Sequence, residues 1–145
     1  AEVTRAVAHG LPVMHGDADH DLAQYPDGAF DYVVLSRTLQ AVERPREVLR
    51  QMLRIGKHAL VSFPNFGHWR VRLSMLVSGR APKTQLFPYN WYDSPNIHFL
   101  TVLDFQLLAA KQGWRIERQI FVSGDQKVTF WPNLLAEMAV FQVAA

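Results

Sequence analysis

Carboxylate and imidazole side chains gather near the start of the chain, where they could bind a metal ion or line a nucleotide site. The group consists of His15, Asp17, Asp19, His20 and Asp21. Both side-chain types are common metal ligands. The alternating aspartates, however, lack the glycine and the terminal glutamate of a calcium-binding loop. We therefore expect a solvated loop beside a nucleotide site and predict no metal here.

A hydrolytic triad could also be assembled from Ser36, His68 and Asp93. Such a triad needs the three side chains in hydrogen-bonding contact. Val34 and Thr38 stand where the Gly-x-Ser-x-Gly turn requires glycines, so Ser36 lacks the turn that exposes the nucleophile in α/β-hydrolases. We therefore do not expect hydrolytic chemistry.

Two aromatic-rich segments, residues 63–69 and 89–99, interrupt the regular pattern of the chain. They contain Phe63, Phe66, Trp69, Tyr89, Trp91, Tyr92 and Phe99, with His68 and His98 among them. These rings could pack as a lid over the core. They could equally form a substrate lid or a partner surface, because aromatic residues and arginine concentrate at binding hot spots and irregular segments often carry function. The polar candidates here are Asn65, His68, Arg70, Asn96 and His98, and the two histidines are the candidate catalytic bases.

Three arginines, Arg46, Arg50 and Arg54, recur at helical spacing and therefore share one helix face. They could form a docking patch for an acidic partner. We favour a solvated face, in which they pair with Glu43 and Glu47.

Hydrophobic periodicity predicts alternating strands and helices. Val48, Leu49 and Met52 form an apolar stripe, which predicts a helix. The run Phe30–Leu35 is almost continuously apolar, which predicts a strand buried on both faces. The predicted helices are Ala1–His9, Pro45–Ile55, a short run near Val71–Leu76, and a helix capped by Thr101 and ended by Gly113. The predicted strands are Leu11–His15, Phe30–Leu35, Ala59–Phe63, Trp114–Phe121 and Glu137–Val143, with turns at Tyr25–Gly28 and Ser123–Asp125.

This order predicts an α/β fold whose parallel sheet ends with an antiparallel strand. Ligands of open α/β sheets bind beyond the carboxyl ends of the strands. Those ends are predicted at Gly16–Asp17, Ser36–Arg37 and Pro64–Asn65. We therefore expect Asp17, Ser36 and Asn65 to meet at one rim and any site to draw on them.

The composition is that of one globular domain spanning residues 1–145. The 145 residues are 49% hydrophobic and carry a net charge of +2, so no basic cluster indicates nucleic acid. The chain has no cysteine, which excludes disulfides and thiolate sites. We see no membrane span and no signal pattern, and we expect a cytoplasmic protein.

Several motifs resemble those of known families. The segment Gly16–Asp19, the strand Phe30–Leu35 and the helix that follows Arg44 are similar to the middle of class I S-adenosylmethionine (SAM) methyltransferases, which have a Rossmann-like sheet. The runs Ser62–Arg72, Trp91–Phe99 and Trp131–Leu134, followed by Ala139–Phe141, resemble the bacterial methionine-biosynthesis family MetW. These motifs extend over most of the chain, from about residue 10 to residue 143.

The resemblance implies site residues. It assigns cofactor contacts to Asp17, Ala18, Ser36, Arg37 and Leu39. The aromatic segments then supply a partner or substrate surface consisting of Asn65, His68, Trp69, Arg70, Trp91, Tyr92, Asn96 and His98. The partner implied by the family is homoserine O-acetyltransferase.

One feature of the methyltransferase pattern is missing. The fold begins with a strand and a turn that needs glycines two residues apart, whereas no two of the eight glycines here are that close. We therefore expect the first two strands to be absent, so that the chain is the C-terminal portion of the domain with an irregular insertion over about 64–100. SAM should bind the intact protein and bind this chain weakly or not at all.

Three functions remain open at this stage. The first is a partner or activator of homoserine O-acetyltransferase in methionine biosynthesis. The second is a SAM-dependent methyltransferase that acts on an unidentified small molecule, with His68 or His98 as the base. The third combines them, with SAM binding as a signal that changes the partner interaction.

Overall fold

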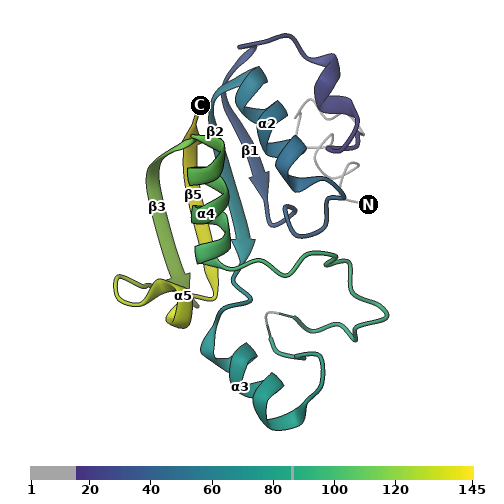
Figure 1. Cartoon of the computed structure of the whole chain (residues 1–145), viewed down its shortest axis with the longest axis vertical. Coiled ribbons are helices and arrows are strands. Elements are labelled where there is room, and N and C mark those ends of the chain that lie inside the picture. Colours follow the sequence, from purple (N-terminus) through teal and green to yellow (C-terminus); the bar gives the residue numbers. More distant parts are fainter. Residues whose placement is uncertain (1–15, 86) are drawn as a thin grey trace, which may run out of the picture.

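Two apolar runs pair as parallel strands in the computed structural model, which describes residues 16–85 and 87–145 (Figure 1). Strand β1 is Phe30–Ser36 and strand β2 is Gly56–Pro64. Tyr32 lies opposite His58, and Ser36 lies opposite Ser62. Both predicted strands are therefore confirmed. The helix predicted over Ala1–His9 and the strand predicted over Leu11–His15 lie outside the described residues.

The remaining strands complete a mixed sheet. Strand β5, Met138–Ala144, runs antiparallel to β2, with Met138 opposite Pro64. Strand β3, Arg115–Ser123, pairs antiparallel with β5, and the order is β1-β2-β5-β3-β4. The predicted α/β fold with an antiparallel last strand is confirmed. The short strand β4, Gln126–Lys127, follows the predicted turn and was not itself predicted.

Helices α2, Pro45–Ile55, and α4, Val102–Gln112, lie across the same face of the sheet (Figure 1). Helix α2 has the predicted bounds because proline fits its first turn and its apolar stripe is buried. Helix α4 begins with a capping box, in which Thr101 and Asp104 each accept a backbone hydrogen bond from the other. Gly113 ends α4 with a left-handed backbone, φ 73°.

The core lies between these two helices and the sheet. Three fully buried phenylalanines form its centre: the ring centroids of Phe105 and Phe141 are 4.5 Å apart, and those of Phe63 and Phe105 are 5.3 Å apart. Aliphatic residues of α2 and β2 surround them, namely Val48, Leu49, Met52, Ala59 and Val61.

The prediction that β1 is buried on both faces is wrong. Val33 and Leu35 are partly buried and pack against the core. Tyr32 and Val34 point to the other face, where they are 55% and 63% exposed. Side chains alternate along a strand, and within the described residues neither α2 nor α4 covers this second face.

The other helices are short or lie away from the sheet. Helix α3, Trp69–Ser78, extends the helical run predicted near Val71–Leu76 and lies below the sheet in Figure 1. The 3₁₀ helix η1, Asp21–Gln24, and helix α5, Pro132–Leu135, were not predicted. None of the helices in residues 16–85 and 87–145 is long and apolar enough to span a membrane.

Candidate functional site at the carboxyl edge of the sheet

The parallel strands β1 and β2 end side by side at one edge of the sheet. The Ser36 and Ser62 hydroxyl oxygens are 3.3 Å apart. The Arg37 backbone N–H donates to the Ser62 carbonyl oxygen at 2.9 Å. Arg37 itself has φ 53°, in the left-handed region that is uncommon for a residue other than glycine. Backbone strain of this kind is concentrated at functional sites, so this edge is a good candidate.

The loop before η1 is organised by Asp17. Its Oδ1 accepts a hydrogen bond from the Asp19 backbone N–H at 2.9 Å, and its Oδ2 lies 2.9 Å from His20 Nδ1. The hydrogen bond from His20 holds the pKa of the Asp17 carboxyl below its usual range, and the same contact raises the pKa of His20. Both side chains are more than half exposed, so this pair faces solvent.

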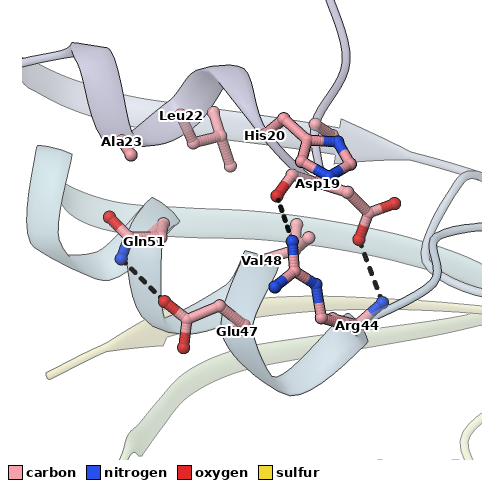
Figure 2. Close-up of a pocket in the computed structure, with 9 residues that line it drawn as sticks. Asp19, His20, Leu22, Ala23, Arg44, Glu47, Val48 and Gln51 are labelled. Carbon is pink, nitrogen blue, oxygen red and sulfur yellow. Dashed lines mark hydrogen bonds between the residues drawn. The ribbon is translucent and has the colours of Figure 1, made fainter.

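Asp19 fixes the same loop to the start of α2. Its Oδ2 accepts from the Glu43 backbone N–H and its Oδ1 from the Arg44 backbone N–H, each at 2.9 Å. The Arg44 guanidinium returns a bond to the Asp19 carbonyl oxygen at 3.2 Å. Figure 2 shows this contact at the mouth of a pocket of about 220 Å³ between η1 and α2. The loop thus lies beside the segment that follows β1.

Four of the five residues predicted to contact the cofactor are exposed or partly exposed. Asp17, Ser36 and Arg37 are exposed and Ala18 is partly exposed. Leu39 is 2% exposed and packs in the core, although it also contributes to the wall of the pocket that contains His98. The exposed Asp17 carboxylate can accept a hydrogen bond from an amino group.

Asn65 follows β2 as predicted, but its side chain is completely buried. Its Nδ2 donates to the carbonyl oxygens of Ala136 at 2.9 Å and Asn133 at 3.1 Å. Its Oδ1 accepts from the backbone N–H of Gly67 at 2.9 Å and of Val102 at 3.3 Å. Asn65 therefore joins β2, α4 and α5, and its assignment to an exposed partner or substrate surface is wrong.

His68 is also buried, with 2% of its surface exposed, and it caps the start of α3. It lines a small pocket with Arg70, Thr84, Gln85 and Glu137. The sequence pattern marks Glu137 only as the first residue of the last strand, so it was missed as a site residue. Its contact with the start of α3 joins segments far apart in the chain and has no local signal in the sequence.

His98 lies on a loop that covers the segment after β1. The backbone N–H groups of Ile97 and His98 both donate to the Gln40 carbonyl oxygen at 3.0 Å. His98 also lines a pocket of about 220 Å³ with Leu39, Pro45, Phe99, Leu100, Asp104, Phe105 and Leu108. Asn96, on the same loop, is partly exposed.

Some aromatic side chains of the two segments pack against one another, whereas others are exposed to solvent. Phe66 stacks on Phe87 with ring centroids 3.7 Å apart, as expected for a lid. Trp91 and Tyr92 instead are 78% and 67% exposed, and Trp69 is 41% exposed, with the Arg70 guanidinium 5.3 Å from its ring centroid. Figure 1 shows this region beyond the carboxyl ends of β1 and β2.

The three residues considered as a triad have other partners. Ser36 contacts Ser62, His68 accepts from the Arg70 backbone, and Asp93 accepts from the Asn90 side chain at 3.4 Å. These contacts give no support to a hydrolytic triad.

The arginine face of α2 has two roles. Arg50 pairs with Glu47 at 2.9 Å on the exposed side, as predicted for a solvated face. The hydrogen bond from Arg50 lowers the pKa of Glu47 to about 2. Arg54 differs, because its side chain is only 29% exposed and its guanidinium donates to the carbonyl oxygens of Tyr25 and Leu22 at 2.9 and 3.1 Å. It holds the turn before β1 against α2.

The sequence of the chain is similar to known protein families. The family model described as "Methionine biosynthesis protein MetW" matches residues 1–143. The chain is 39% identical over 136 residues to a "Bifunctional methionine biosynthesis protein MetXA/MetW" of Rhodopirellula baltica, covering 90% of this chain and 22% of that protein. It is 28% identical over 140 residues to a demethylmenaquinone methyltransferase of Listeria monocytogenes, covering 88% of this chain and 58% of that protein. The chain thus spans less than two thirds of these curated relatives.

Solved structures agree in fold. A SAM-dependent methyltransferase of Thermotoga maritima, described as a possible histamine N-methyltransferase, superposes with a TM-score of 0.65 at 16% identity, covering 98% of this chain and 67% of that one. A SAM-dependent methyltransferase of Archaeoglobus fulgidus gives 0.65 at 13% identity, covering 99% and 72%. The chain therefore has an α/β methyltransferase-like fold.

Proposed function

The chain belongs to the MetW family of methionine biosynthesis proteins, and we propose that it acts in this biosynthesis by binding and supporting homoserine O-acetyltransferase. The observation that carries the proposal is the exposed aromatic and basic surface beyond the carboxyl edge of the sheet. It has two parts: Trp69 and Arg70 lie at the start of α3, and Trp91 and Tyr92 lie on the loop between α3 and α4. Large aromatic side chains and arginine contribute most of the binding energy at protein interfaces.

The bifunctional relative supports the same proposal. Its name joins MetXA and MetW in one protein, and a covalent link between two parts keeps them at high local concentration. Separate chains that act together need a contact surface instead. The four surface residues above are available for it.

Copurification tests this function. Tagged protein and homoserine O-acetyltransferase from the same organism are mixed at micromolar concentration and separated by size-exclusion chromatography. We expect coelution and a change in acetyltransferase activity. Independent elution at 10 µM, together with unchanged acetyltransferase activity, would reject the proposal.

A second candidate is a SAM-dependent methyltransferase that acts on an unidentified small molecule. The methyltransferase-like fold and the accessible edge at Asp17, Ala18, Ser36 and Arg37 favour it. These residues would hold the cofactor, which supplies an electrophilic methyl group when bound. The chain's own task is then to orient the acceptor and remove its proton.

The two candidate bases, His68 and His98, differ in the hydrogen bonds of their rings. The Nδ1 atom of His68 accepts a backbone hydrogen bond, so the proton of the neutral ring is on Nε2 and that atom donates. His98 has no such contact assigned to its ring among the described residues. His98 is therefore the better candidate base.

Calorimetry with SAM tests this second function. We expect weak or no heat with the 145-residue chain, and clear binding by a longer version that includes a strand and a glycine-rich turn before it. Absence of binding by both versions would reject a SAM-dependent activity. Turnover that survives His98→Ala would remove His98 from the mechanism.

A further inference from the structure

A small pocket with charged groups at its wall lies near the starts of β5 and α3. It has a volume of about 190 Å³ and is lined by His68, Arg70, Thr84, Gln85 and Glu137. The Asn65 backbone N–H donates to the Glu137 carbonyl oxygen at 2.8 Å, which holds the start of β5 against the end of β2. The pocket therefore has a rigid base at the carboxyl edge of the sheet.

His68 presents a hydrogen-bond donor to this pocket. Its Nδ1 accepts from the Arg70 backbone N–H at 3.3 Å and so carries no proton. Burial lowers the pKa of His68 below its ordinary value of 6.5, which keeps the ring neutral at pH 7. The single ring proton is then on Nε2, and no described residue is assigned as its acceptor.

Arg70 and Glu137 supply opposite charges that are only loosely paired. Arg70 Nη1 and Glu137 Oε1 are 3.7 Å apart, which is longer than a charge-assisted hydrogen bond of about 2.8 Å. Glu137 is held in place because its Oε2 accepts from the Gly124 backbone N–H at 2.9 Å. Both charged groups therefore keep hydrogen-bonding capacity for a ligand.

The two charges define the chemistry of that ligand. A carboxylate can accept from Arg70 and from His68 Nε2, and the positive end of the α3 dipole favours the same group. An ammonium can donate to Glu137. A multiply charged anion such as phosphate would be repelled by the same carboxylate.

We infer that this pocket binds the α-carboxylate and α-ammonium groups of a small amino acid. Its volume corresponds to about six water molecules at about 30 Å³ each, which is the size range of such a ligand. Thr84 and Gln85 add uncharged polar groups at the wall. The site shares Arg70 with the exposed aromatic and basic surface, and none of its lining residues belongs to the cofactor edge at Asp17 and Ser36.

Titration calorimetry on the purified protein tests the inference with L-serine and L-methionine as probes. Each is compared with its carboxamide, which lacks the carboxylate, and with its N-acetyl derivative, which lacks the ammonium. We expect at least one free amino acid to bind and both of its derivatives to bind about tenfold more weakly, because each loses a charge-assisted hydrogen bond.

Two variants connect the effect to the residues. Arg70→Gln should remove the preference for the free acid over the carboxamide, and Glu137→Gln should remove the preference over the N-acetyl derivative. The amide introduced by Glu137→Gln keeps an oxygen that can accept from the Gly124 backbone N–H, so the fold should persist. Arg46→Gln, on the exposed face of α2, is the matched control and should bind like the original protein.

Three results would overturn the inference. One is that neither amino acid binds at 10 mM. Another is that the derivatives bind as tightly as the free amino acids, and the third is that inorganic phosphate binds more tightly than either. None of these depends on association with the acetyltransferase, so this site and the proposed function fail separately.

Discussion

The Asn65 side-chain amide donates to the carbonyl oxygen of Ala136 at 2.9 Å, and both residues are completely buried. This one bond connects the end of β2 to the segment that leads into β5. The opposite end of the same amide accepts from the start of α4. The carboxyl edge is thus organised by a buried side chain rather than by a surface residue.

Asn65→Ala should destabilise the fold by about 3 kcal/mol or more, because it leaves several buried backbone groups without partners. Urea unfolding followed by circular dichroism measures this change. Asn96→Ala is the control, because Asn96 is partly exposed and its side chain has no hydrogen bond assigned to another residue in 16–85 or 87–145. The control should change stability by less than about 0.5 kcal/mol. Equal losses in the two variants would contradict the central role of Asn65.

Gly67→Ala should also destabilise the fold, by about 1–3 kcal/mol, since an added methyl group would overpack the same region. A Cβ at this position would lie 2.8 Å from both the backbone oxygen and the Oδ1 of Asn133. Thermal unfolding measures the effect. Gly79→Asn is the comparison, because Gly79 has φ 62° and open space around it, and asparagine tolerates that conformation. A stability loss in Gly79→Asn as large as in Gly67→Ala would argue against crowding.

The helix boundaries were predicted well, because they depend on residues close together in the sequence. The bounds of α2 follow from Pro45 and its apolar stripe, and Thr101 marks the start of α4. The burial of β1 was mispredicted because strand composition does not reveal which strand has an uncovered face. Tyr32 and Val34 have the residue types of a buried strand, but only Val33 and Leu35 meet the core.

The site was predicted less completely than the fold. The edge formed by Ser36 and Arg37 follows from the parallel strand order, which the sequence pattern contained. The burial of Asn65 depends on backbone groups of Asn133 and Ala136, far along the chain. Such long-range hydrogen bonds leave no periodic trace, so a buried structural asparagine looks like a surface candidate.

Stability should fall as the pH drops below about 6.5, and His68 is one cause. Its pKa is lower in the folded state than the ordinary value of 6.5, because burial disfavours the charged ring. The unfolded chain therefore binds more protons in this range, and the free energy of unfolding decreases as the pH falls. The pKa values of Asp17, Asp31, Glu47 and Glu117 are lowered from 3.8 or 4.5, so these carboxyl groups titrate at lower pH than the unfolded-state histidine.

His68→Gln isolates this contribution. Urea unfolding at several pH values should show a shallower decrease in the free energy of unfolding below about pH 6.5 than in the original protein. His20→Gln is the matched control with the opposite sign: the pKa of His20 is raised by Asp17, so its contribution is lost as the pH rises through that value. An unchanged slope in His68→Gln would mean that His68 is not the group that titrates.

Trp91→Ala should weaken association with homoserine O-acetyltransferase without destabilising the chain. Its side chain is 78% exposed, so the substitution removes little packing within the chain. If the interface buries Trp91, the loss of binding free energy should be about 2 kcal/mol or more, as is usual for hot-spot residues. This loss corresponds to an increase of about thirtyfold in Kd. Phe130→Ala is the control, because Phe130 is 61% exposed on the segment before α5. Binding measured by biolayer interferometry should fall for Trp91→Ala and for Tyr92→Ala but not for Phe130→Ala. If all three variants bind like the original protein while the complex still forms, the acetyltransferase must use another face, and the exposed second face of the sheet around Tyr32 and Val34 becomes the next surface to test.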